Sequence, residues 1–118
     1  MRKLTENEIS TLKVQNCSAK DWMAINVSED FDPSRFQSVH FSGNINIGSQ
    51  TLDFTLKGGM TYPAGIYNAT LHNVTVGDNC LIRNVREHIA NYEIGEGSCI
   101  ENVGSIVVDD ESSFGNGV

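Results

Sequence analysis

An internal repeat of eighteen residues constrains this chain more than any other feature of its sequence. Residues 76–85 align with residues 94–103 at an offset of 94 − 76 = 18, with four identical and three conservative positions. Aliphatic residues here also fall on one six-residue grid, which only His88 interrupts: Val76, Ile82, Ile94, Ile100 and Ile106. Arrays of six-residue repeats are typical of solenoids. A β-sandwich with coincidental spacing is the alternative, and the eighteen-residue echo disfavours it.

A six-residue period has a specific physical meaning. Three short strands joined by tight turns make one triangular coil of eighteen residues, and coils stack through parallel ladder hydrogen bonds. The first position of each hexad points into the narrow interior. The fifth also faces inward, near a corner that admits only a small side chain, and Cys80 and Ser98 occupy it. Cys99 also fits a packing position, and Asn84 and Asn102 fit corners with positive φ. The sequence predicts a mainly β, parallel β-helix.

The chain divides into a helical N-terminal cap, residues 1–35, and β-helix coils, residues 36–118. Thr5 and Glu8 have the spacing of a capping box, which predicts a helix over residues 5–15 across the open end of the coils. A second, shorter turn begins at residues 18–21 and carries Trp22. Residues 36–75 are less regular, and the three glycines and one proline of residues 57–65 indicate a loop expelled from a corner. Residues 113–118 resemble the start of another repeat, so we expect a chain truncated at its C-terminal end.

Composition excludes several classes of partner. The net charge is −7 and the eight basic residues are scattered, a pattern that repels nucleic-acid phosphates. No apolar run is long enough to span a bilayer, and no apolar segment follows Arg2 and Lys3 as in a signal peptide. Three cysteines without CxxC spacing suit reduced thiols. We therefore expect a cytoplasmic protein that binds neither nucleic acid nor membranes.

Four segments carry a family resemblance: residues 64–67, 69–79, 88–92 and 100–104. They resemble a family of uncharacterised bacterial hexapeptide-repeat proteins, a domain-of-unknown-function family sometimes labelled as resembling sugar-nucleotide pyrophosphorylases. The resemblance covers nearly the whole chain and implies a left-handed β-helix. The left hand rests on the resemblance alone, because other parallel crossovers are nearly always right-handed. More distantly, the repeats are similar to those of hexapeptide acyltransferases and nucleotidyltransferases, in which a histidine often acts as general base between trimer subunits.

His72 and His88 are the candidate catalytic residues. They lie 88 − 72 = 16 residues apart, close to one coil length, so they can occupy adjacent coils near one edge. An imidazole there can act as a general base for an acyl acceptor. A strict hexad count turns His88 inward, whereas a one-residue slip at Ile89 turns it outward. The alternative to a catalytic role is that both histidines are ordinary surface or corner residues. Zinc needs three or more ligands and only the distant His40 remains, so we expect no metal and no cofactor.

Two functions remain open. The chain is either a non-catalytic scaffold portion of a larger hexapeptide-repeat protein, or part of a transferase-like enzyme that acts on sugar nucleotides or acyl donors. In the second case later coils or a neighbouring subunit complete the site. The scaffold fits these residues better, because they contain no complete catalytic constellation. In both cases we expect self-association into a homo-oligomer, since an uncovered terminal coil exposes strand groups and apolar side chains.

Overall fold

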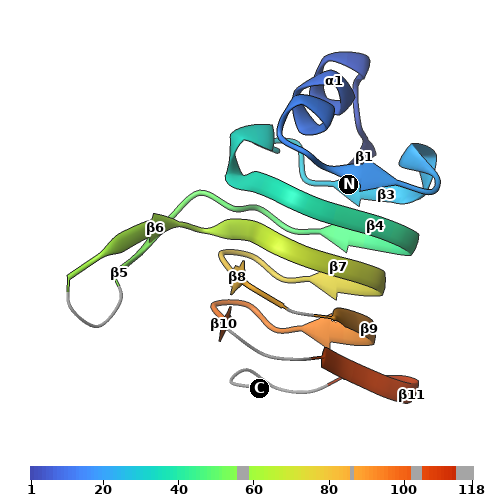
Figure 1. The fold of residues 1–118 in the computed structure, drawn as a ribbon, viewed down its shortest axis with the longest axis vertical. Coiled ribbons are helices and arrows are strands. Elements are labelled where there is room, and N and C mark those ends of the chain that lie inside the picture. The colour runs from blue at the N-terminus through green and yellow to red at the C-terminus, as the bar shows by residue number, and fades with distance from the viewer. Residues whose placement is uncertain (56–58, 86, 102–104, 114–118) are drawn as a thin grey trace.

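The computed structural model describes residues 1–55, 59–85, 87–101 and 105–113, the last of these segments by its backbone alone. The described chain is mainly β, with a mixed sheet and one α-helix, as Figure 1 shows. Its elements, in chain order, are β1 (Arg2–Lys3), α1 (Glu6–Val14), β2 (Ser18–Ala19), the 3₁₀ helix η1 (Trp22–Ala24), β3 (Ile25–Val27), the 3₁₀ helix η2 (Pro33–Arg35), β4 (Phe36–Ile47), β5 (Asp53–Thr55), β6 (Thr61–Pro63), β7 (Gly65–Val76), β8 (Leu81–Arg83), β9 (His88–Ile94), β10 (Cys99–Glu101) and β11 (Ser105–Ser113).

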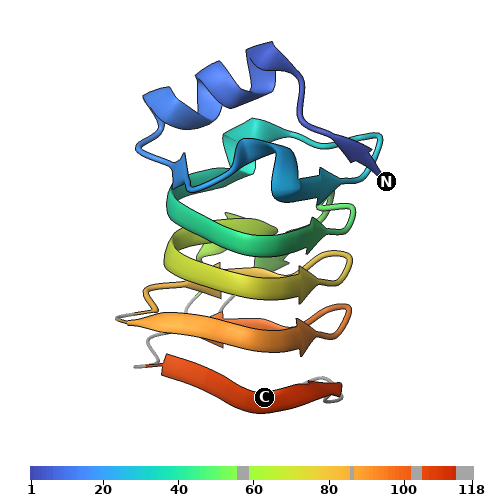
Figure 2. The same cartoon turned by 90° about the vertical axis from the view of Figure 1, so that its right-hand side faces the viewer.

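Parallel ladders connect most of the strands. β4 pairs with β7, β7 with β8 and β9, β8 with β10, and β9 with β11, all in parallel. The register repeats at offsets near the predicted length: Leu71 faces Ile89 (89 − 71 = 18) and Leu81 faces Cys99 (99 − 81 = 18). In Figure 2 these strands lie as successive layers, with α1 at one end and β11 at the other. The eighteen-residue echo in the sequence is therefore the spacing between hydrogen-bonded neighbours.

The interior consists of columns of apolar side chains that face one another across the ladders. One column runs through Phe36, Ile66, Ile82 and Ile100, one residue from each of β4, β7, β8 and β10, and every member is buried. A second runs from Val27 through Ile47, Val76 and Ile94, and is equally buried. Burial of Val76, Ile82, Ile94 and Ile100 is thus confirmed, and the Ile106 side chain lies outside the described residues.

The corner positions also follow the prediction, with one error. Cys80 and Ser98 are buried, as expected for small residues at the fifth hexad position. Cys99, however, is exposed, so the expected packing role is wrong. Its counterpart Leu81 is fully buried on β8, which lies between β7 and β10, whereas Cys99 lies on β10 at the end of this strand order among the described residues. Asn84 has the expected positive φ of 54°, and its amide accepts a hydrogen bond from Asn68 at 3.3 Å; the predicted partner Asn102 lies outside the described residues.

The N-terminal segment contains the predicted helix. The Thr5 hydroxyl accepts from the Glu8 backbone N–H at 3.2 Å, and the Glu8 carboxylate accepts from the Thr5 N–H at 2.9 Å, which closes the capping box. Leu12 is buried in the same core cluster as the strand interiors, so the helix covers the end of the stack. The shorter predicted turn is η1, which begins at Trp22. The segment also contains three short strands that the sequence did not indicate, and β3 pairs with β4.

The expelled loop is a hairpin that projects from the stack (Figure 1). Strands β5 and β6 pair antiparallel, away from the main sheet. Phe36 on β4 faces Ile66 on β7 at an offset of 66 − 36 = 30, which exceeds the eighteen-residue offset by 30 − 18 = 12. The buried Gln50 side chain anchors the exit point: its amide donates to the carbonyls of Gly48 and Gly77 and accepts from the Cys80 N–H at 2.8 Å.

Candidate functional site

The structure places His72 and His88 on neighbouring strands of one outer face. Leu71 on β7 and Ile89 on β9 face one another, and both side chains are buried. His72 comes directly after Leu71, and His88 comes directly before Ile89. The two imidazoles are therefore offset by two residues along the strand direction. Ile89 is fully buried and His88 is half-buried. The inward position therefore belongs to Ile89, as in the one-residue slip, and not to His88, as in the strict hexad count.

Hydrogen bonds occupy both ring nitrogens of His72. The Ser42 hydroxyl lies 2.8 Å from His72 Nδ1, and the Asn73 amide nitrogen lies 3.2 Å from His72 Nε2. His40 makes the same kind of contact one strand earlier, where its Nδ1 lies against the Ser18 hydroxyl. A serine beside an imidazole is the first element of a nucleophile–base pair. Here, however, a substrate proton can reach a His72 nitrogen only if one of these two contacts opens.

Among the side chains of residues 1–55, 59–85 and 87–101, no three His, Cys, Asp or Glu groups come together as ligands for a metal ion. In the described part of the chain, no helix has the length and apolar character needed to cross a membrane.

The thiols lie in surroundings that favour the protonated form. Burial raises the pKa of Cys17 and of Cys80 above the ordinary value. The pKa of the exposed Cys99 is also raised, first by partial desolvation and then by the nearby Glu101 carboxylate. A nucleophilic cysteine needs a lowered pKa, so these environments do not activate a thiol.

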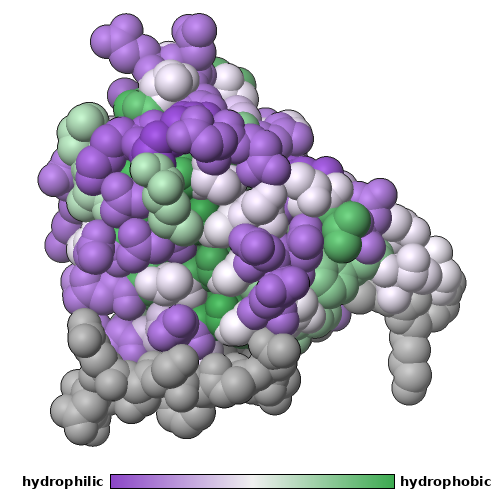
Figure 3. Space-filling model, turned by 180° about the vertical axis from the view of Figure 1, so that it is seen from behind, coloured by the Kyte–Doolittle hydropathy of each residue, from purple (hydrophilic) through white to green (hydrophobic). Residues whose placement is uncertain are grey.

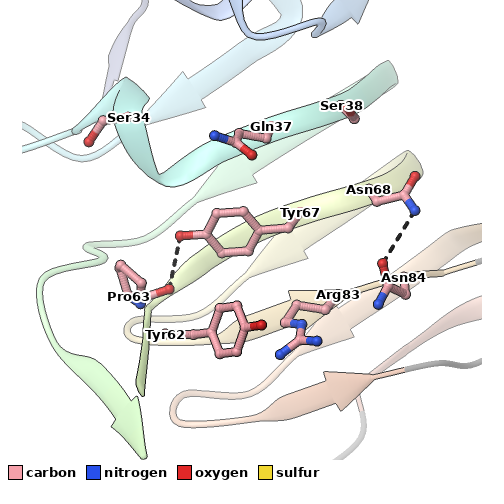
Figure 4. A pocket seen from close by; sticks show the side chains of 9 residues that line it. All are labelled: Ser34, Gln37, Ser38, Tyr62, Pro63, Tyr67, Asn68, Arg83 and Asn84. Carbon is pink, nitrogen blue, oxygen red and sulfur yellow. Dashed lines mark hydrogen bonds between the residues drawn. The ribbon is translucent and has the colours of Figure 1, made fainter. Parts of the chain in front are cut away.

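A groove of about 520 Å³ beside the hairpin was not predicted from the sequence. Figure 4 shows the polar and aromatic side chains that line it: Ser34, Gln37, Ser38, Tyr62, Pro63, Tyr67, Asn68, Arg83 and Asn84. They come from η2, β4, β7, β8 and the residue after it, and from the base of the hairpin. The signal in the sequence was the expelled loop itself, because a hairpin that leaves a flat wall of strands forms a concave angle with it. Tyr62 and Tyr67, on either side of Pro63 in the sequence, could have been predicted to line this concave surface.

The space-filling view from behind shows a different surface (Figure 3). Hydrophilic residues there alternate with small apolar areas. The fold and these surfaces define a mainly β protein of stacked parallel strands, with an end-covering helix and a projecting hairpin. The chain belongs to the family described as "Domain of unknown function (DUF4954)", whose match extends over residues 1–118. No curated protein and no solved structure matches it.

Proposed function

We propose that this chain forms the N-terminal coils of a left-handed parallel β-helix that serves as a non-catalytic scaffold. The observation that carries the proposal is the in-register stacking of buried side chains on parallel strands, above all Phe36, Ile66, Ile82 and Ile100. Such columns make each coil depend mainly on its neighbours, which gives a rigid rod that can be lengthened coil by coil. The left hand rests on the resemblance of the repeats to hexapeptide proteins.

The two ends of the stack differ, and this difference supports a capped scaffold. At one end α1 and the short strands β1–β3 cover the interior. At the other, β10 pairs with β8 and β11 pairs with β9 within the described residues. Among the described residues, no further strand pairs with the outer edges of β10 and β11, and such edges can accept strands from additional coils or from a second copy. This is the basis for proposing a homo-oligomer.

Deletion of residues 1–35 tests the capped scaffold. Leu4, Leu12 and Cys17 belong to the core cluster, so their removal uncovers the interior of the next coil. We expect the shortened chain to aggregate, whereas a Val14→Ala variant, altered at an exposed position of the same helix, stays soluble. Sedimentation velocity and far-ultraviolet circular dichroism separate the outcomes. A soluble, monomeric deletion with an unchanged β signal contradicts the cap.

The Ser42–His72 contact supports a second candidate, a transferase-like activity. In that case His72 is the general base, and the acceptor hydroxyl displaces Ser42 from Nδ1. The test incubates the protein with acetyl-coenzyme A or UDP-glucose and candidate acceptors, and follows release of free thiol or of UDP. Loss of turnover in His72→Ala but not in the matched surface variant His40→Ala supports the enzyme. Absence of turnover with both donors favours the scaffold.

A further inference from the structure

The groove beside the hairpin has an aromatic floor that is fixed before any ligand arrives. Gln37, Tyr67 and Arg83 face one another across β4, β7 and β8, so their side chains form one row on the outer wall. The Tyr67 hydroxyl donates to the Pro63 carbonyl at 3.0 Å, which ties the ring to the base of the hairpin. Partial burial raises the pKa of Tyr67, so the phenol stays neutral and keeps the proton that it donates to Pro63.

The Tyr62 ring is held in place by Arg83. The Arg83 guanidinium carbon lies 3.9 Å from the centre of the Tyr62 ring, a cation–π contact. Arg83 is itself ion-paired with Glu101 at 3.2 Å. In Figure 4 the Tyr67 ring lies above the Tyr62 ring, and Gln37 lies above both. Both rings are seen nearly face-on in this view. Two aromatic faces therefore lie along one wall, and their positions are set by contacts within the protein.

The polar groups of the groove are mostly neutral and can both donate and accept. Side-chain amides come from Gln37, Asn68 and Asn84, and hydroxyls come from Ser34 and Ser38. Asn68 donates to Asn84 at 3.3 Å, which orients the amides at the rim. Among the described residues, the lining contains no carboxylate, and Arg83 is its one cation, which Glu101 neutralises. A phosphate-bearing ligand would meet a chain with a net charge of −7 and, in the described lining, no uncompensated positive charge.

These features point to one class of ligand. We propose that the groove binds a neutral pyranose carbohydrate, whose C–H faces stack on Tyr62 and Tyr67 while its hydroxyls bond to Gln37 and the rim amides. Ring-lined concave sites with a few placed polar groups are the usual form of small-ligand sites. A peptide strand fits less well, because the backbones of β4, β7 and β8 are already paired with one another and offer no free edge here. The inference does not depend on the scaffold proposal or on the hand of the coils.

Titration with neutral oligosaccharides tests the proposal on the full chain. The probes are the hexasaccharides of glucose, mannose, galactose and N-acetylglucosamine, with UDP-glucose as a charged comparison. Saturation-transfer NMR detects contact with the sugar protons, and the tyrosine ring signals locate it. We expect at least one neutral probe to bind with a dissociation constant on the order of a millimolar and to shift the Tyr62 and Tyr67 resonances.

Substitutions then assign the binding to the groove. Tyr62→Ala removes one ring and is expected to weaken binding by about tenfold. Tyr62→Phe keeps the ring and retains the affinity to within about twofold. Gln37→Ala, at an exposed position with little effect on folding, weakens binding by about threefold to tenfold. Met60→Ala changes an exposed residue near the hairpin but outside the groove lining, and leaves the affinity unchanged.

Two results overturn the proposal: no neutral probe binds, whether or not UDP-glucose does, or the folded Gln37→Ala and Tyr62→Ala variants both bind as the wild type does. Amide NMR spectra establish that each variant is folded. If Tyr62→Ala fails to fold, Gln37→Ala decides the question, and wild-type affinity of this variant overturns the proposal. These readouts are independent of oligomeric state, so failure of the groove leaves the scaffold proposal untouched.

Discussion

Replacing Ile82 by alanine probes the interior column on which the stacking depends. Ile82 is fully buried and faces Ile66 on one side and Ile100 on the other. Three carbon atoms leave the interior, a transfer loss of about 2.5 kcal/mol. A residual void of roughly 50–75 Å³ adds about 1–2 kcal/mol, because ladder-bound backbones on both sides limit collapse. The expected loss in the free energy of unfolding is therefore about 4 kcal/mol.

Urea denaturation followed by circular dichroism measures this loss. A domain of this size has a total stability of about 5–15 kcal/mol, so Ile82→Ala removes a large fraction of it. Ile82→Val, expected to cost about 0.5–1.5 kcal/mol, remains measurable if the alanine variant does not fold. Leu52→Ala, at a side chain 59% exposed, is the matched control and should change stability by no more than about 0.5 kcal/mol.

Hydrogen exchange distinguishes loss of a column contact from a general loss of stability. In a stacked architecture a void loosens its own layer most, so amides of β8 and β10 should lose more protection than those of β3. The reasoning fails if Ile82→Ala costs less than about 1 kcal/mol, because a collapsible or solvent-filled site would then replace the rigid column. Equal loss of protection in every strand would instead show that the layers unfold as one unit.

Three further predictions concern the N-terminal cap and the first coil. Thr5→Ala breaks the capping box and should lower the free energy of unfolding by about 0.5–2 kcal/mol in urea titrations. Hydrogen bonds from Arg2 hold the pKa of Glu8 below its ordinary value of 4.5, so Glu8 stabilises the fold above about pH 4.5 and this stabilisation is lost as the pH falls through the lowered pKa. Glu8→Gln should therefore be less stable than the wild type at neutral pH and equal to it in acid; a constant difference across this range would refute the charge effect. Gly65→Ala places a Cβ 2.0 Å from the Arg35 carbonyl oxygen, and the forced backbone shift should cost about 1–3 kcal/mol by thermal denaturation. Unchanged stability of this variant would mean that the first coil tolerates a wider spacing.

The sequence predicted the regular stacking of parallel strands well because each signal there is local and repeated. Val76 lies opposite Ile94 and Ile82 opposite Ile100, as an eighteen-residue echo requires. The slip at Ile89 was hard to predict, since a one-residue shift exchanges the inner and outer faces of a strand. Cys99 is exposed although its counterpart Leu81 is buried, so the position in the repeat alone does not determine its burial. Only the residues with which a strand pairs determine which of its side chains point inward and which point outward.

The pairing of β4 with β7 and the groove could not be found from periodicity. β4 pairs with β7 at an offset of 30 that shortens to 76 − 47 = 29 beyond a bulge, so no single period spans residues 36–75. The groove combines β4, β7, β8 and the hairpin, and Gln37 and Arg83 are 83 − 37 = 46 residues apart. Their proximity arises from two successive ladders. The histidines, by contrast, were singled out for their chemistry, and the structure puts them on one face without testing a role.

The hairpin that leaves the stack after Gln50 adds 30 − 18 = 12 residues to the offset between paired strands, while Phe36 and Ile66 on either side remain opposite one another. The entropy of closing a loop grows only slowly with its length, by about 0.6 kcal/mol for each doubling. The Gln50 hydrogen bonds fix the exit point independently of what lies beyond it. The exit point at Gln50 is therefore a suitable graft position: a different peptide or an affinity tag inserted there should be displayed on the wall of stacked strands without altering their spacing.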